Sequence, residues 1–144
     1  MFEFSELLDH AAVCQDPARR VAYVAAFVIS AFAHTERVRK PLNPALGETF
    51  SWSSPDGAKR FFAEQVSHHP PVGVSRFLAP SWTAGEVVDI KATFSGNSIE
   101  LKSLGSRSIA LMEFDEDYTW NLPCTSVSNL FIGGAFVDHH GEIE

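Results

Sequence analysis

His68 and His69 stand side by side ahead of Pro70 and Pro71, which makes them the residues of this sequence best suited to bind a ligand. Imidazole rings can donate N–H hydrogen bonds to a phosphate, above all when the phosphate favours the protonated ring. The fixed backbone of two prolines would stiffen the chain behind the rings and fix their direction. The pattern therefore allows an anion-binding pair.

Two other interpretations of this pair stay open from sequence. It could be an ordinary turn with one histidine half-buried, or it could hold zinc together with His34, His139 or His140. The spacing of these histidines fits no standard zinc pattern, and neighbouring residues of a strand face opposite sides. We therefore predict neither a metal site nor a cofactor.

Lys40 and Asn43 form a second candidate, because two prolines bracket them in a rigid corner rich in donors, with Leu42 between them. The same corner could be a solvated loop. Lys91 lies on the polar side of an alternating segment. That side usually meets solvent, but it would point inward in a barrel whose cavity has a polar end.

Motifs that would indicate catalysis are missing from this sequence. It has no nucleophile elbow, phosphate-binding P-loop, dinucleotide fingerprint or zinc-protease motif. Acidic residues are plentiful, but their spacing marks no catalytic pair. The sequence therefore favours a binding protein over an enzyme.

The charge distribution argues against several classes of partner. The chain has 144 residues and a net charge of −7, and no Lys or Arg follows Arg107. Such a chain is unsuited to nucleic acid, whose binding depends on cations, and to a surface held to anionic lipid by charge alone. Two cysteines outside any paired motif favour a reducing, cytoplasmic location.

The first forty residues predict two helices, and the rest predicts strands. Asp16 and Pro17 suit the N-cap and first position of the second helix, and the run from Val21 to Ala33 is too short to span a membrane. Short strands are then predicted at 49–52, 60–65, 88–94, 99–102, 108–114, 117–121 and 127–132. Apolar and polar residues alternate with a period of two at 88–94 and 99–102. The glycines at 85, 96, 105, 133 and 134 are expected to separate strands.

This order of elements predicts an α+β, mainly antiparallel β fold. Alternation continues to Ile143 without a terminating signal, so we expect the chain to be a piece of a larger unit.

The segment Glu64–Pro71 reads EQVSHHPP and resembles the fingerprint of oxysterol-binding and related proteins. Further matches occur in the family's order: SELLD at 5–9, YVAAF at 23–27, KPLNP at 40–44, LGET at 46–49, GNSIE at 96–100, YTWN at 118–121 and HGE at 140–142. The resemblance covers nearly the whole chain but only the N-terminal portion of the family's domain.

The resemblance implies one partial domain over 1–144, with a helical segment at 1–40 and strands at 45–144. These strands would form part of a large, incomplete β-barrel around a lipid tunnel. By motif, His68 and His69 would bind an inositol phosphate, Lys40 and Asn43 would contact the headgroup, and Leu42 would lie at the tunnel mouth. Lys91 would be a further ligand.

The implied function is lipid binding and non-vesicular lipid transfer, with a sterol or phosphatidylinositol 4-phosphate as the cargo. We expect a cytoplasmic protein that touches membranes transiently, at membrane contact sites. The alternative is a fragment without transfer activity of its own, because the second half of the family's domain supplies further basic headgroup ligands.

Overall fold

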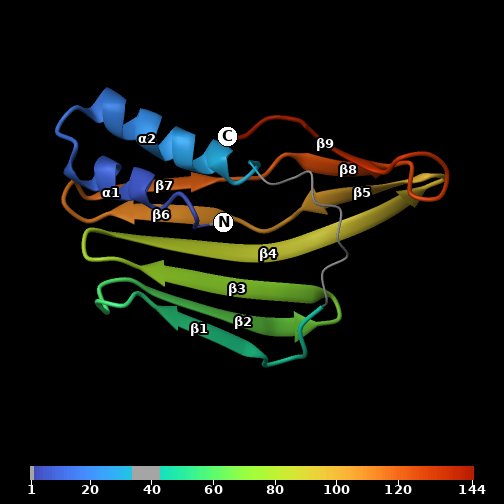
Figure 1. Ribbon diagram of the computed structural model, residues 1–144, viewed down its shortest axis with the longest axis horizontal. Coiled ribbons are helices and arrows are strands. Elements are labelled where there is room, and N and C mark those ends of the chain that lie inside the picture. Colours follow the sequence, from blue (N-terminus) through green and yellow to red (C-terminus); the bar gives the residue numbers. More distant parts are fainter. Residues whose placement is uncertain (1, 34–42) are drawn as a thin grey trace.

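Two helices open the fold, as predicted. The computed structural model describes residues 2–33 and 43–144, with α1 at Glu6–Val13 and α2 at Pro17–Ser30 (Figure 1). Asp16 caps α2: its Oδ1 accepts hydrogen bonds from the backbone N–H of Ala18 at 2.9 Å and of Arg19 at 3.4 Å. Neither helix is long and apolar enough to cross a membrane.

An antiparallel sheet of nine strands follows the helices in the described part of the chain. The strands are β1 (Thr49–Ser53), β2 (Arg60–His68), β3 (Pro71–Leu78), β4 (Trp82–Ser95), β5 (Ser98–Ser103), β6 (Arg107–Leu111), β7 (Glu116–Trp120), β8 (Cys124–Ser128) and β9 (Phe136–His140). β1 and β9 lie at opposite ends of the strand order, so the sheet is not closed. The α+β class with an incomplete barrel is confirmed.

The long strand β4 joins the two parts of the sheet. β6 pairs with its N-terminal half and β5 with its C-terminal half, both along the edge that faces away from β3. Gly105 lies where the chain passes from β5 to β6, and a Cβ there would come within 1.9 Å of the Val87 carbonyl oxygen. This close approach allows both halves of β4 to keep their partners.

The core lies where the helices cover one end of the sheet. Its fully buried large side chains are Leu8 from α1, Trp82 from β4, and Ile109 and Leu111 from β6. Burying each of them stabilises the fold by roughly 1.5–3 kcal/mol. Phe77 stacks on Trp82 with ring centroids 5.1 Å apart. The helices are thereby fixed to one half of the sheet.

Several sequence-based expectations for the strands were wrong. The segment predicted at 127–132 is a strand only as far as Ser128, and β9 was not foreseen. Gly85 does not separate strands; it lies inside β4, where an added Cβ would meet Ser108 Oγ at 3.1 Å. The strand β3 was not foreseen at all. The residues on the core side of this strand include Gly73, which has no side chain, and the polar Ser75, so the apolar alternation that identifies a half-buried strand is weak.

Candidate functional site

The site is built on one face of the sheet. Alternation along β4 places Trp82, Ala84 and Glu86 on the side covered by the helices, and all three are buried. We call this side the inner face. Further along β4 the same row reaches Ile90 and Phe94, which are 43% and 71% exposed. The inner face is therefore covered at one end and open and apolar at the other.

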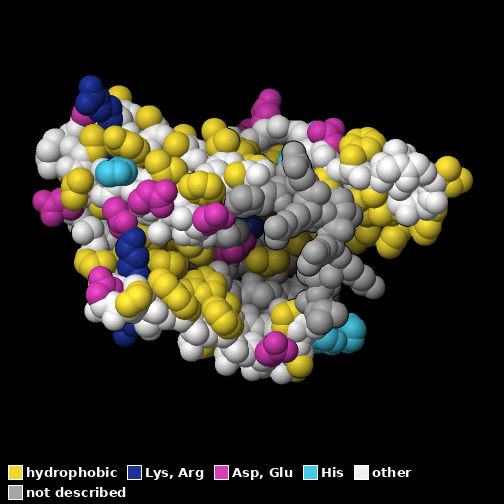
Figure 2. All heavy atoms as spheres, in the orientation of Figure 1, with side chains coloured by type: hydrophobic (Ala, Val, Ile, Leu, Met, Phe, Trp, Pro, Cys, Tyr) yellow, Lys and Arg dark blue, Asp and Glu magenta, His cyan; other side chains and the backbone are white. Residues whose placement is uncertain are grey.

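Figure 2 shows this side of the molecule as a hollow between the helices and β1–β3, with hydrophobic side chains in it. A small pocket of about 90 Å³ lies on the inner face. It is lined by Val88, Ile90, Leu101, Ser103, Arg107, Leu122, Pro123 and Thr125. A larger depression of about 290 Å³, around Gly85, lies on the opposite face. The inner pocket is the one next to the open apolar row.

A buried ion pair lies beside this pocket. Arg107 Nη2 donates a hydrogen bond to Glu86 Oε1 across the β4–β6 register, and both side chains are 8% exposed. Burial raises the pKa of Glu86, against the opposing effect of Arg107. Arg107 Nε and Nη1 and the neighbouring Ser75 Oγ have no hydrogen-bond partner. Sequence reasoning missed this polar group, because neither residue stands in a recognisable motif.

His68 reaches the inner face because of a β-bulge. Phe61, Ala63 and Gln65 of β2 lie on the inner face, so simple alternation would turn His68 outward. The register shifts between Gln65 and Ser67, which leaves Val66 without a partner in β3. One extra residue reverses the alternation beyond it. His68, which pairs with Pro71, is thus on the inner face.

The segment before β1 contacts His68. His68 Nδ1 lies 3.0 Å from the carbonyl oxygen of Pro44, which can only accept, so Nδ1 donates the hydrogen bond. The buried Gln65 donates from Nε2 to Asn43 Oδ1 at 3.4 Å and to the Ser67 carbonyl oxygen at 2.9 Å. This bonding ties Asn43 to the same end of β2. Gln65 is a positioning residue that sequence reasoning overlooked, although it lies in the EQVSHHPP segment.

His68 and His69 are close enough to act on one ligand. Their ring centroids are 4.6 Å apart and the rings are nearly perpendicular. His69 is exposed, and His68 is partly exposed. The structure therefore brings Asn43, His68 and His69 together at the end of β2. This arrangement offers imidazole and amide groups to a polar ligand.

The other predicted ligands are not joined to this group. Lys40 and Leu42 lie outside the described residues. Lys91 is exposed on β4, where its backbone pairs with Lys102 of β5. Alternation places it on the opposite side of the sheet from Ile90. No hydrogen bond or ion pair of the described residues connects Lys91 with Asn43, His68 or His69.

The zinc alternative finds no support in the described residues. His139 Nδ1 hydrogen-bonds to Thr125 Oγ1 at 2.9 Å, and its ring packs against Phe32. His140 follows it on β9 and so faces the other side of the sheet. His34 lies outside the described residues. His68 and His69 belong to no group of three potential metal ligands in the described part of the chain.

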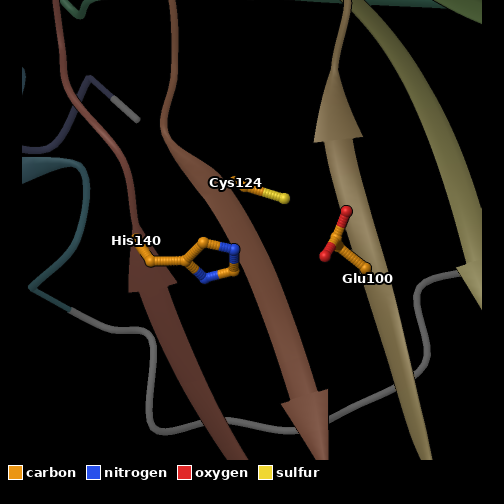
Figure 3. A group of neighbouring side chains, drawn as sticks. All are labelled: Glu100, Cys124 and His140. Carbon is orange, nitrogen blue, oxygen red and sulfur yellow. The ribbon is translucent and has the colours of Figure 1, made fainter. Parts of the chain in front are cut away.

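One such group does occur elsewhere, on β5, β8 and β9, where Glu100, Cys124 and His140 point toward one another (Figure 3). Their ligand atoms lie within 4.8 Å of one another. Burial and the nearby Glu100 raise the pKa of the Cys124 thiol, although Lys102 beside it acts in the opposite sense. Glu100 and His140 are exposed, and exposed acidic groups commonly cluster in this way without a bound ion. We assign no metal site to this group.

Sequence comparison identifies relatives of this chain. The family profile described as "Oxysterol-binding protein" matches residues 1–144. Oxysterol-binding protein homolog 2 of Saccharomyces cerevisiae is 46% identical, and human oxysterol-binding protein-related protein 7 is 36% identical. Each match covers 98% of this chain but only 11% and 17% of the respective relative.

Solved structures share the fold. The Osh1 ORD domain in complex with cholesterol superimposes with a TM-score of 0.91 at 37% identity, and the match covers 99% of this chain and 35% of that one. The Osh3 ORD of Saccharomyces cerevisiae in complex with PI(4)P gives 0.86 at 33% identity and covers 99% and 38%. The match over all 144 residues, with this fold, shows that the chain belongs to the oxysterol-binding protein family.

Proposed function

We propose that the chain forms part of a lipid carrier, with the lipid tail on the open end of the inner face and the headgroup at Asn43, His68 and His69. The observation that carries this proposal is how the open apolar row and the histidines are arranged on the sheet. The apolar row that includes Ile90 and Phe94 is left open to a ligand, and His68 turns toward the same face.

The energetics suit a ligand with two chemically different parts. Apolar area of a sterol or acyl chain that leaves water contributes about 25 cal/mol per Å². A phosphate oxygen gains charge-assisted hydrogen bonds from imidazolium rings, which are about twice as strong as neutral ones. Binding alone performs the carrier function, so the proposal needs no catalytic group.

The relatives support the choice of lipid. One solved relative holds cholesterol and another holds PI(4)P. Because the chain spans about a third of each of those chains, whole-domain transfer between membranes is part of the proposal. Lys40 and Leu42 stay proposed ligands of the headgroup, together with cytoplasmic, peripheral contact with membranes. Lys91, on the opposite side of the sheet from Ile90, is left out of this site.

The headgroup part is tested with a water-soluble, short-chain phosphatidylinositol 4-phosphate and titration calorimetry. Each hydrogen bond to a charged group contributes about 1.5–3 kcal/mol, so His68→Ala and His69→Ala should each weaken binding by about 10-fold or more. His140→Ala, which changes a histidine at another site, should leave the affinity unchanged. Equal affinity of all four proteins would remove the histidine pair from the site.

A further inference from the structure

The far end of the sheet carries an apolar tip made of two neighbouring connections. Phe94 belongs to the β4–β5 hairpin, and Phe131 and Ile132 belong to the segment that joins β8 to β9. Their side chains are 71%, 76% and 78% exposed, respectively. We call these three residues the apolar tip. Exposed apolar groups gathered in this way mark interaction surfaces.

Asn97 holds the two connections together. Its Oδ1 accepts hydrogen bonds from the backbone N–H of Phe131 at 2.8 Å and of Ile132 at 3.2 Å, and its Nδ2 donates to the Ile132 carbonyl oxygen at 2.9 Å. Its own carbonyl oxygen accepts from the Leu130 N–H at 3.0 Å. The tip is thus a fixed shape, and its exposed side chains take no part in these bonds.

No charged residue occurs in either connection. Residues 92–99 and 126–137 contain no Asp, Glu, Lys, Arg or His, in a chain whose net charge is −7. Figure 2 shows only hydrophobic and uncharged side chains over the far right end of this view. A surface without charge loses little when it leaves water for a lipid interface, whereas charged groups there are costly.

The tip lies at the same end of the sheet as the histidine pair. β2, β4 and β8 run in the same direction, because β3 is antiparallel to β2 and β4, and β5 is antiparallel to β4 and β8. Their C-terminal ends, at His68, Ser95 and Ser128, therefore point the same way (Figure 1). The proposed headgroup site and the apolar tip therefore face the same way, and the tip projects beyond His68, which the registers place level with Ile90.

From these observations we propose that the apolar tip docks on a lipid bilayer by inserting Phe131 and Ile132 between the headgroups. This inference rests on the proposed function, because docking would bring the proposed lipid-binding site to the membrane. Hydrophobic insertion drives the contact, because the tip has no cation to attract anionic lipid. Docking should therefore occur on neutral vesicles and change little with salt.

The test is sedimentation of the 144-residue protein with phosphatidylcholine vesicles that contain neither sterol nor phosphoinositide. The wild type should bind, and Phe131→Ser and Ile132→Ser should each lower the partition coefficient about 10-fold. Val13→Ser is the matched control, because Val13 is 67% exposed at the C-terminal end of α1, away from the tip. It should bind as the wild type does, and raising NaCl from about 50 to 500 mM should leave all results unchanged.

A second measurement reports insertion directly. The variant Phe131→Trp should be quenched by phosphatidylcholine brominated on its acyl chains, beyond the quenching seen in the wild type. Equal sedimentation of all variants, binding that needs anionic lipid and falls with salt, or self-association abolished by Phe131→Ser would each overturn the proposal. Sterol uptake from cyclodextrin involves no membrane, so it separates membrane docking from lipid binding. The tip variants should still take up sterol. Absence of uptake by the wild type would count against the proposed function alone.

Discussion

At the scale of single residues, Val66 determines which face of the sheet His68 lies on. It is the extra residue of the bulge between Gln65 and Ser67, and the bulge turns His68 toward the inner face and the Pro44 carbonyl. The histidine pair is conspicuous in the sequence, but its direction depends on a register shift that no local pattern reveals. The link from Gln65 to Asn43 was equally hidden, because it joins residues 22 positions apart.

Inserting one alanine between Val72 and Gly73 would give Val66 a partner in β3, which should remove the bulge and turn His68 to the opposite face. Binding of soluble phosphatidylinositol 4-phosphate should then fall by about 10-fold or more, the loss expected for a charge-assisted hydrogen bond. The substitution Val66→Ala is the control, because it keeps the extra residue and should bind as the wild type does. If the insertion variant kept full affinity, the bulge would have no role in positioning His68.

At the scale of elements, one ion pair ties α2 to β7. Arg20 Nε donates to Glu116 Oε2 at 3.0 Å, and Arg20 Nη1 donates to the Cys14 and Gln15 carbonyl oxygens. Tyr118 also donates to Glu116 Oε2, at 2.6 Å. The hydrogen bond from Arg20, followed by that from Tyr118, lowers the pKa of Glu116 from 4.5 to about 2. The packing of α2 against β7 therefore depends on the charge of the Glu116 carboxylate.

Acid should weaken this contact in a defined pH window. The pKa of Glu116 is lower in the folded chain than in the unfolded chain, so its contribution is complete above about pH 4.5 and is lost as the pH falls toward 2. In thermal unfolding, Glu116→Gln should lower the midpoint at pH 7 and have less effect at pH 3. An equal effect of the substitution at both pH values would refute this coupling.

The ion pair between Glu86 of β4 and Arg107 of β6 offers a second test at the scale of elements. Arg107→Met should destabilise the fold by about 3–5 kcal/mol, because it leaves the buried Glu86 carboxylate unpaired. Replacing both residues by Met should restore stability to within about 1 kcal/mol of the wild type or exceed it. Urea denaturation measures both values, with Arg76→Met on the exposed side of β3 as a neutral control. A double variant as unstable as the single one would contradict this.

The elements themselves were predictable wherever their local signals were strong. Asp16 and Pro17 predicted the start of α2, and period two predicted the second half of β4. β3 was missed because its inner row contains the small residues Gly73 and Ser75 in place of large apolar ones. The length of β4 was missed because Gly85 resembles a break. Tertiary pairing overrides these weak local signals.

At the scale of the whole molecule, the buried core and the open apolar surface lie at opposite ends of one sheet. The helices bury one end of the inner face around Trp82, and the other end stays open beside the histidine pair and the apolar tip. Seven acidic residues follow Arg107 without a compensating cation, and together they equal the whole net charge of −7. The family resemblance predicted the open, partial barrel, and the comparisons confirm it.

The central claim is that one lipid occupies the inner face with its headgroup at the histidine pair. Native mass spectrometry after incubation with cholesterol, soluble phosphatidylinositol 4-phosphate or both tests it most directly. The account predicts one lipid per chain in each case, with either lipid displacing the other, and loss of only the phosphoinositide complex in His68→Ala. Simultaneous binding of both lipids, or the absence of any one-to-one complex, would contradict it.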